Sequence, residues 1–417
     1  MKAIRLILLF LCTLVIWFAV NQYFFCPSYN FPAPAPFKGS QLYNPYAYMD
    51  SGCWHKCNFH AHSNAWKGLT NGDDSASTIW KKYDLLGYSV HCVSEYQQIN
   101  ESFHNSINYI PAYEHGFNLR KTHQLVLGDD HISWLDYFFP QTLSNKQRVL
   151  NVLKQNDSNI VVLNHPQLKK GYSPDELRYL TNYQCMEVLN ASVASFPQWD
   201  AALSAGKAVF IVGDDDTHHI NDINCIGREC TWINLKVINR RNVLAALRYG
   251  QGYGMHIASL KGESPMNRIK RIKYQLPVLK SFILRDDTIF VKMNQPAERI
   301  LFSGQDGKIL SAFSGTSSAY YVIKKDDPYV RSSFLFRDGT AIFLNPVFRH
   351  SGDPFLMKGA VVNHGRTVLL FLLGLNILLL WAVLLLMMIF GTYWLKYNPG
   401  PYMAELNQGL RPALRIV

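Results

Sequence analysis

The sequence has few charged residues, and it lacks long runs of a single charge. Asp, Glu, Lys and Arg make up 17% of its 417 residues, a low share that is expected where part of a chain lies in lipid. Lysine and arginine exceed the acidic residues by 41 to 30, which gives a formal net charge of +11. Because no block of consecutive basic residues occurs, no nucleic-acid partner is expected. The positive balance suits phosphate-rich partners or an anionic membrane surface.

Cysteine is also scarce, with eight residues in the chain. Cys53 and Cys57 are close in sequence, as are Cys225 and Cys230, but neither pair has the second half of a four-ligand zinc site. A structural zinc of that kind is therefore not predicted. Either pair has the spacing for a disulfide if this part of the chain lies outside the cytoplasm. The chain also lacks internal repeats and low-complexity tracts.

An apolar run occurs near the N-terminus. The segment LILLFLCTLVIWFAV (6–20) follows two basic residues, as in a secretory signal or a signal anchor. No small-residue cleavage site follows it, and the aromatic residues that come next suit a membrane interface. The pattern predicts an uncleaved signal anchor over residues 1–25, with a cleaved signal as the alternative.

A second apolar run occurs near the C-terminus. VLLFLLGLNILLLWAVLLLMMIF (368–390) has no charged residue and exceeds the roughly 20 residues that span a bilayer. A buried helix of a soluble protein is the alternative, but such a helix would not be apolar on every side. We therefore expect a transmembrane helix over residues 367–391.

Basic residues near the two runs predict the orientation of the chain. They lie at both ends of the sequence: Lys2, Arg5, Lys396, Arg411 and Arg415. Both ends are therefore expected to be cytoplasmic, including a tail over residues 392–417. The region between the runs is expected to be extracytoplasmic, either periplasmic or at the cell surface.

Between the runs, the sequence predicts a linker and two folded regions. Residues 26–55 are rich in Pro, Tyr and Asn and read as a linker. From 56 to 262, short β-like runs alternate with helix-like stretches, which favours a mostly parallel sheet or barrel. The expected strands are 57–60, 88–94, 108–114, 123–128, 159–164, 183–190 and 208–213. The expected helices are 77–86, 144–155, 174–180, 199–205 and one that Asn239 caps and Gly250 ends.

From residue 267 to 350 the pattern changes to β-like runs separated by Gly, Asp and Asn. RDDT, GQDGK and RDGT are typical of hairpin turns, so we expect a small all-β module of the β-sandwich type. The preceding RIKRIKY (268–274) is predicted to be a short strand or linker with one exposed face.

Polar residues suited to metal binding lie at the ends of the expected strands. His60 and His62 end the first strand, where residues i and i+2 point to the same side. Other polar residues at strand ends are Glu95, Tyr96, Glu114, His165, Asp216 and His218. In parallel α/β barrels the strand C-termini share one face. A single histidine at such a position is more often structural, but one face that collects so many favours a metal site.

His123 begins its strand rather than ending it. Only eight residues separate it from Glu114, which is too few for a parallel crossover. We therefore expect a hairpin that returns His123 to the end where Glu114 lies. Imidazoles mixed with carboxylates suit zinc, manganese or iron. Because the residues exceed the four ligands of one closed zinc site, two or three divalent ions are expected.

This arrangement resembles the PHP (polymerase and histidinol phosphatase) domain. NFHAH, VSEY, PAYEHG, THQLVLG, VVLNHP and VGDDDTH occur in the order and spacing of that family, over residues 56–253. LRDGTAIFLNPV is similar to the β-module that ends some phosphoesterase members. The resemblance implies a distorted seven-stranded barrel with a trinuclear metal centre and phosphoesterase activity. It implies as ligands His60, His62, Glu114, His123, His165, Asp216 and His218.

Two departures from the family pattern affect this implied centre. The usual Thr-Asp-His is Ser-Glu-Tyr here, so Tyr96 stands at a ligand position, and a neutral phenol with a pKa near 10 is a poor ligand. The acidic residue expected after the first motif is Asp73 or Asp74, with Asn71 in the closer register, and of these we favour Asp74. One metal site is therefore altered or empty.

The combined interpretation is a membrane-anchored, extracytoplasmic, metal-dependent phosphoesterase. Its substrate would be a phosphorylated small molecule, lipid or glycan, and His218 or His123 would protonate the leaving group. Glu187 and Asn190 are candidates for hydrogen bonds to the ligands. The alternatives are a binding or scaffold module that has lost turnover, which Tyr96 favours, and a metal-dependent amide or lactone hydrolase.

Overall fold

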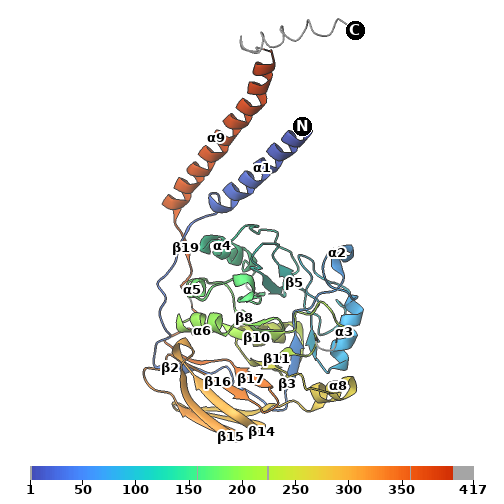
Figure 1. Cartoon of the computed structure of the whole chain (residues 1–417). Coiled ribbons are helices and arrows are strands. Elements are labelled where there is room, and N and C mark those ends of the chain that lie inside the picture. The colour runs from blue at the N-terminus through green and yellow to red at the C-terminus, as the bar shows by residue number, and fades with distance from the viewer. Residues whose placement is uncertain (1, 157, 223–224, 357, 398–417) are drawn as a thin grey trace. The chain divides into compact units, whose positions relative to one another are not determined.

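The structure is a computed structural model that describes residues 2–156, 158–222, 225–356 and 358–397 (Figure 1). The chain divides into two units, one made of its two ends and the other of residues Tyr29–Val361. The predicted cytoplasmic tail, 392–417, lies outside the described residues from 398 onward.

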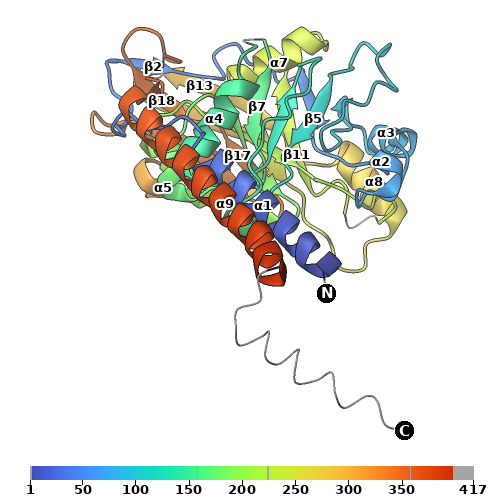
Figure 2. The same ribbon diagram turned by 90° about the horizontal axis from the view of Figure 1, so that it is seen from above.

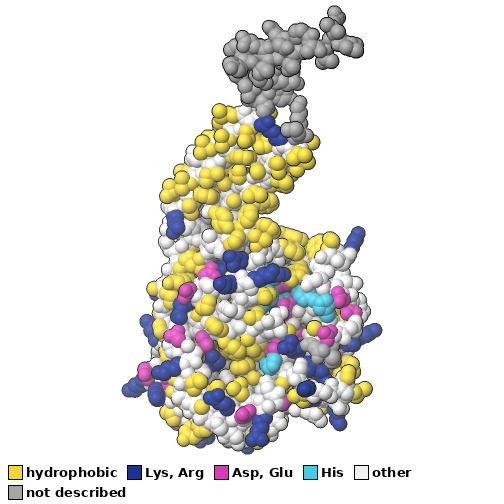
Figure 3. Space-filling model, viewed as in Figure 1, with side chains coloured by type: hydrophobic (Ala, Val, Ile, Leu, Met, Phe, Trp, Pro, Cys, Tyr) yellow, Lys and Arg dark blue, Asp and Glu magenta, His cyan; other side chains and the backbone are white. Residues whose placement is uncertain are grey.

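The unit made of the chain ends contains two long apolar helices, α1 (Lys2–Tyr23) and α9 (His364–Tyr397). They contact each other, and Trp381 Nε1 donates a hydrogen bond to Thr13 Oγ1 at 3.1 Å. Their surfaces are covered by apolar side chains (Figure 3). Both are long and apolar enough to cross a membrane. Length and composition alone are compatible with membrane association or, for α1, with a signal sequence.

Short helices cover the sheets of the larger unit. The helices are α2 (Ala65–Gly68), α3 (Ala76–Leu85), α4 (Leu143–Leu153), η1 (Leu168–Lys170), α5 (Pro174–Leu177), α6 (Phe196–Ser204), α7 (Arg240–Arg248), α8 (Pro265–Tyr274) and η2 (Gln305–Gly307). The five helices predicted from sequence are confirmed as α3 to α7. Asn239 caps α7 as predicted, because its side chain accepts a hydrogen bond from the backbone N–H of Asn242.

The first sheet carries most of the predicted α/β strands. Its strands are β5 (Ala112–His115), β6 (Gln124–Leu127), β7 (Ile160–Leu163), β8 (Cys185–Asn190), β9 (Val193–Ala194) and β10 (Phe210–Asp214). They lie in the order β10-β8-β7-β6-β5, with β9 paired to β8. β5 and β6 are antiparallel, with Glu114 opposite Leu125. The predicted hairpin between Glu114 and His123 is therefore confirmed.

The second sheet joins the remaining α/β strands to the β-rich region. Its strands are β2 (Gln41–Tyr43), β3 (Trp54–Asn58), β4 (Val90–His91), β11 (Glu229–Asn234), β12 (Gly252–His256), β13 (Leu279–Arg285), β14 (Thr288–Ser303), β15 (Ile309–Val322), β16 (Tyr329–Leu335), β17 (Ala341–Leu344) and β18 (Val347–His350). Two further short strands are β1 (Tyr29–Asn30) and β19 (Val361–Val362). The three predicted turns join β13 to β14, β14 to β15 and β16 to β17.

The β-rich region is continuous with the α/β region. β12 pairs with β17 through Tyr253–Leu344 to His256–Ala341. One hydrophobic core includes Tyr83 of α3, Met255 of β12 and Phe334 of β16. The two regions therefore share a sheet and a core within one mixed α/β fold. The predicted boundary between a barrel at 56–262 and a module at 267–350 stays a prediction.

The predicted seven-stranded barrel is not detected as a continuous sheet among the described strands. The two sheets meet instead through two isolated parallel bridges, Ala61 with Thr217 and Tyr96 with Glu114. β4 is only two residues long, and beyond it Gln97 has a φ of +50°. The chain thus leaves the extended conformation where a barrel strand would have to continue.

The sequence prediction of a strand or linker at 268–274 is wrong, because this segment forms α8. The Ser264 side chain caps the helix by accepting from the N–H of Asn267, and Pro265 occupies its first turn. Arg268 and Ile272, four residues apart, form its buried face. Figures 1 and 2 place α8 beside α3. The Lys56 amine joins these helices by donating to Leu86 O and Ile272 O, each at 2.7 Å.

A buried aspartate holds the loop that follows β10. Asp215 accepts from the backbone N–H groups of Gly227, Arg228 and Glu229 at 2.7 to 2.9 Å, and from the Tyr83 hydroxyl at 3.0 Å. Burial raises the pKa of Asp215, and these hydrogen bonds oppose the rise. The next residues along the loop, Asp216 and His218, belong to the candidate site.

We expect Asp215→Ala to destabilise the fold by about 3 kcal/mol, because it leaves three buried N–H donors without an acceptor. Urea unfolding of the metal-stripped protein measures this change. Asp326→Ala, at an exposed position in the β15–β16 connection, is the matched control and should cost less than about 0.5 kcal/mol. Equal midpoints for the two variants would contradict the assigned role of Asp215.

Candidate metal centre

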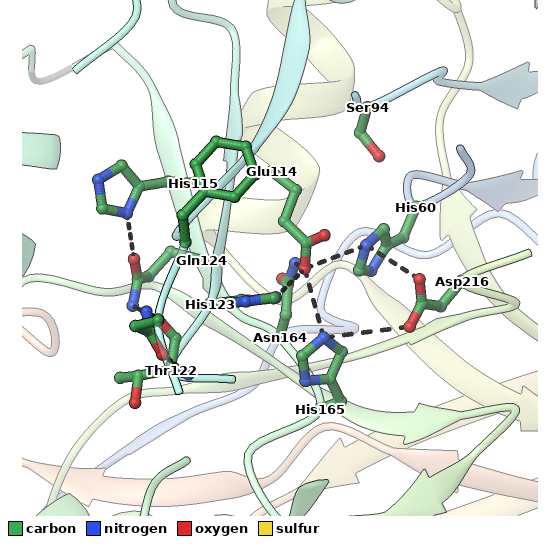
Figure 4. A network of polar contacts seen from close by, with 12 residues as sticks. His60, Ser94, Glu114, His115, Thr122, His123, Gln124, Asn164, His165 and Asp216 are labelled. Carbon is green, nitrogen blue, oxygen red and sulfur yellow. Dashed lines mark hydrogen bonds and ion pairs between the residues drawn. The ribbon is translucent and has the colours of Figure 1, made fainter. Parts of the chain in front are cut away.

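Seven imidazole and carboxylate side chains meet where the two sheets approach each other. We call them the central cluster, and they are His60, His62, Glu114, His123, His165, Asp216 and His218. His60 and His62 follow β3, Glu114 lies in β5, and His123 precedes β6. His165 follows β7, while Asp216 and His218 follow β10. Figure 4 shows five of these side chains pointing toward one another: His60, Glu114, His123, His165 and Asp216.

The first half of the cluster surrounds the two histidines after β3. Their Nε2 atoms lie 3.0 Å apart. His60 Nε2 is 3.4 Å from Glu114 Oε1 and 3.3 Å from Asp216 Oδ1. His62 Nε2 is 3.2 Å from Glu114 Oε2 and 3.4 Å from Asp216 Oδ1. Two imidazoles and two carboxylates thus present their donor atoms to one small volume.

The second half of the cluster extends from Glu114 toward β6 and β7. Glu114 Oε1 is 2.9 Å from His123 Nδ1 and 3.3 Å from His165 Nε2. His165 Nε2 lies 4.0 Å from Asp216 Oδ2. Glu114 therefore contacts four histidines at once and connects both halves (Figure 4).

The donor atoms of the cluster fit bound cations. Glu114 Oε2, Asp216 Oδ1 and His218 Nε2 are buried and make no hydrogen bond within the described part of the chain. An ion held at about 2.1 Å from each donor places neighbouring donors about 3.0 to 3.4 Å apart, which is the range observed around His60 and His62. Buried ionic groups of this kind are costly unless they are paired or coordinate metals.

Three overlapping groups of donors have the proximity needed to hold an ion. They are His60–His62–Glu114, His62–Asp216–His218 and Glu114–His123–His165. Glu114 belongs to two groups, and its two carboxylate oxygens would allow it to serve two neighbouring ions. His62 also belongs to two groups, but the single lone pair of its Nε2 would serve one ion. The cluster is consistent with metal binding at more than one position, and it does not identify the metal.

Electrostatics couple the members of the cluster. Burial lowers the pKa of His60, but the carboxylates of Asp216 and Glu114 outweigh burial and hold that pKa well above its usual range. Burial raises the pKa of Glu114, but His123 and His60 outweigh it and hold the pKa well below its usual range. Without cations, protons on the imidazoles balance the buried carboxylates. Metal binding would displace these protons.

His218 and Tyr96 complete the wall around His62. The His218 ring stacks on His62 with centroids 4.4 Å apart, and its Nδ1 donates to Asp216 O at 3.0 Å. Burial and neighbouring His62 lower the pKa of His218 to about 4. The Tyr96 ring stacks on the other side of His62 at 4.5 Å. Burial raises the Tyr96 pKa, and Glu114 and Asp216 raise it further, so its phenol is neutral without a metal.

Three polar residues orient the cluster from outside. Glu187 Oε1 accepts from His60 Nδ1 at 3.0 Å, and its Oε2 accepts from the His165 N–H at 2.7 Å. The Asn190 amide donates to Asp216 Oδ2 at 3.1 Å. Both contacts agree with the sequence hypothesis for Glu187 and Asn190. The Asn164 amide donates to Glu114 Oε1 at 3.0 Å, a contact that sequence reasoning missed.

The missed contact of Asn164 depends on an unusual backbone conformation. Consecutive side chains of a strand point to opposite sides, so Asn164 and His165 would not be expected to reach one carboxylate. His165 has a φ of +29°, and Asp216 has a φ of +47°. Such conformations are rare for residues other than glycine and cluster at functional sites. The only signal in the sequence was the position of Asn164 beside a predicted ligand.

The structure does not bring the predicted ligand Asp74 into the cluster. Its carboxylate accepts from the Asn221 amide at 2.7 Å in an exposed setting. Asp73 likewise pairs with His219 in an exposed contact. Glu95 binds the hydroxyl and N–H of Ser63 and thereby holds the loop after β3. All eight cysteines are free thiols in the structure, so neither of the two local pairs is bonded.

No protein-family model matches this chain, and no curated protein matches it. The fold is distantly similar to a two-domain protein containing a predicted PHP-like metal-dependent phosphoesterase from Bacteroides vulgatus ATCC 8482, with 12% identity and a TM-score of 0.39. That match covers 78% of this chain and 99% of the other. A second match is PsfC from Pseudomonas syringae PB-5123, with 17% identity, a TM-score of 0.36, and coverage of 53% and 96%.

Replacement of Glu187 tests whether it positions the cluster. We expect Glu187→Gln to weaken divalent-ion binding about 10- to 100-fold, because the amide nitrogen of glutamine cannot accept from the second N–H donor. Competition with a fluorescent chelator measures the affinity. Asp74→Asn is the matched control and should bind ions as the wild type does. A stronger loss in Asp74→Asn than in Glu187→Gln would reverse the assignment.

Proposed function

We propose that this protein is a metal-dependent phosphoesterase. The observation that carries the proposal is the central cluster, in which buried histidines and carboxylates from both sheets approach one another with unpaired donor atoms. The residues proposed to hold divalent ions, zinc, manganese or iron, are the seven of the central cluster, with Tyr96 as an additional or substitute ligand. When bound, such ions activate water and neutralise charge on a phosphoryl group.

The chain's own residues prepare this chemistry by orienting the donors. Glu187 accepts the Nδ1 proton of His60, which leaves the Nε2 lone pair of neutral His60 facing the cluster. Asn164 and His123 both bind Glu114 Oε1 and restrict the rotation of that carboxylate. Because every one of these groups is buried, the geometry is set before a substrate arrives.

His123 is the better placed of the two histidines predicted to protonate the leaving group. Its Nδ1 faces Glu114, and its ring borders a surface pocket, so its Nε2 can hold a proton toward a substrate there. His218 is less suited to this role, because its Nδ1 proton is bound to Asp216 O and its ring stacks on His62 within the cluster. We propose that His218 serves as a ligand.

Two observations favour a phosphate ester over the other candidate substrates. The sequence motifs resemble those of the PHP family, and the two bridges between the sheets allow a distorted barrel of that type. The Lys121 amine lies 5.5 Å from the centre of the Tyr96 ring, where a cation can contact a phosphate.

The two long apolar helices support a membrane-anchored protein whose larger unit, residues 29–361, is extracytoplasmic.

Hydrolysis assays on the purified full-length protein test the proposed reaction. We expect a metal-dependent turnover of an aryl phosphate that chelation abolishes and that added Mn²⁺ or Zn²⁺ restores, with no turnover of an aryl amide or a lactone. Bound metal without turnover of any substrate would support the scaffold alternative. Preferred turnover of the amide or lactone would contradict the phosphoesterase assignment.

The number of bound ions tests the sharing of ligands between donor groups. Since Glu114 belongs to two groups through a carboxylate with two oxygens, and His218 belongs to one group, Glu114→Ala is expected to lose more metal per chain than His218→Ala. Elemental analysis after dialysis against a metal buffer gives the stoichiometry. Equal losses in the two variants would show that the groups do not share Glu114.

A further inference from the structure

A pocket of about 430 Å³ opens beside the central cluster. The buried side chains of Tyr96 and His123 form its floor, and the loops at 69–71, 116–121 and 138 form its walls. Its size lies within the range of small-molecule sites. The pocket is the described cavity that His123 lines, so a substrate of the proposed reaction would pass through it.

The mouth of this pocket is unusually apolar. Four large side chains, which we call the apolar rim, line it and remain exposed: Leu69 (88%), Phe117 (51%), Leu119 (52%) and Phe138 (53%). The indole rings of Trp66 and Trp134, also exposed, lie against each other 6.3 Å apart. Large exposed apolar side chains that line one pocket favour a binding site over ordinary protein surface.

Hydrogen bonds hold the apolar rim in place. The Leu119 N–H donates to Phe138 O at 3.1 Å, and the Phe117 N–H donates to Asp136 Oδ2 at 2.7 Å. Trp66 Nε1 donates to Tyr96 O at 2.7 Å. These hydrogen bonds hold the loops that carry the apolar side chains. The apolar rim is therefore exposed at the pocket and is not packed into the core.

Two polar side chains of the pocket, Asn118 and Thr70, are engaged within the protein, whereas Lys121 and the exposed Asn71 remain available to a ligand. Asn118 binds the backbone of Thr122 through both ends of its amide. Thr70 Oγ1 donates to Ala65 O at 3.2 Å. Lys121 has a φ of +56° and holds its amine over the Tyr96 ring. The pocket therefore offers one cation near the cluster and an apolar wall further out.

We propose that this pocket binds a phosphate ester with a long alkyl chain, the phosphate near Lys121 and His123 and the chain against the apolar rim. This inference rests on the phosphoesterase function proposed above and names its substrate class. A sugar phosphate would find few free hydrogen-bonding groups along the wall. A phosphorylated lipid matches both the charge near the floor and the apolar surface at the mouth.

Binding of non-hydrolysable alkylphosphonates tests the proposal without requiring turnover. The full-length, Mn²⁺-loaded protein is placed in phosphatidylcholine nanodiscs, and calorimetry gives the affinities of methyl-, butyl- and hexylphosphonate, with hexanol as a charge-free probe. We expect the affinity to rise about two- to fourfold per methylene and hexanol to bind at least tenfold more weakly than hexylphosphonate.

Substitutions in the apolar rim separate the pocket from the surrounding bilayer. Phe138→Ser and Leu119→Ser are expected to reduce the gain per methylene to less than half, whereas Met266→Ser, at an exposed position in α8, should leave it unchanged. Lys121→Gln should weaken all three phosphonates by a similar factor, and Lys292→Gln, on β14, should not. If the affinity of Phe138→Ser still rises per methylene as in the wild type, the rise reflects partition into the bilayer, and the proposal is overturned.

The outcomes distinguish this inference from the proposed function. If methyl- and hexylphosphonate bind equally well while an aryl phosphate is hydrolysed, the alkyl substrate class is wrong and the phosphoesterase function stands. If hexanol binds as tightly as hexylphosphonate, the pocket does not select a phosphate. If no phosphonate binds and no phosphate ester is hydrolysed, the proposed function fails together with the inference.

Discussion

The mutual approach of buried ionisable groups is the constraint on which this structure depends. Glu114 is fully buried and contacts His60, His62, His123 and His165. Burying a carboxylate away from water is unfavourable unless positive charge or hydrogen bonds compensate it. Protons on the imidazoles or bound cations supply that charge. The convergence of both sheets on one point is stable only with such compensation.

Much of the surrounding structure serves to hold this point. Asp215 ties the loop after β10 to the start of β11, and this loop carries the donor residues Asp216 and His218. Glu187 spans from His60 to the backbone of His165. The left-handed backbone at His165 and Asp216 costs conformational energy. These features are typical of a site in which geometry is maintained at some cost to stability.

The sequence predicted the elements of the fold better than their assembly. All seven α/β strands, five helices and the β5–β6 hairpin could be derived from periodicity, caps and loop length. β11 and β12 were not predicted. The segment of α8 was predicted as a strand or linker, because its many basic residues obscure the helical pattern and its buried face consists of only Arg268 and Ile272. Alternation favoured a mostly parallel sheet or barrel, and the family resemblance implied a seven-stranded barrel. The two sheets are instead joined by single bridges, a long-range property that local patterns do not encode.

The candidate site was predictable to the extent that it lies at strand ends. His60 and His62 share a face because of strand geometry, and His123 returns to Glu114 because the connection is short. Asp74 was chosen by proximity in sequence, but the loop that carries it turns toward Asn221. Asn164 escaped prediction because its orientation depends on the φ of its neighbour. Contacts set by irregular backbone are therefore the ones that require a structure.

The larger unit combines a polar, charged centre with an apolar rim at the adjoining pocket, and the two terminal helices are apolar over their lengths. These features together agree with the proposed function of a phosphoesterase that acts near a membrane. Anomalous X-ray scattering from crystals grown with Mn²⁺ or Zn²⁺ tests the central claim most directly. The account predicts at least two anomalous peaks among His60, His62, Glu114, Asp216 and their neighbours. A crystal structure with these side chains apart, or with metal bound only elsewhere, would contradict it.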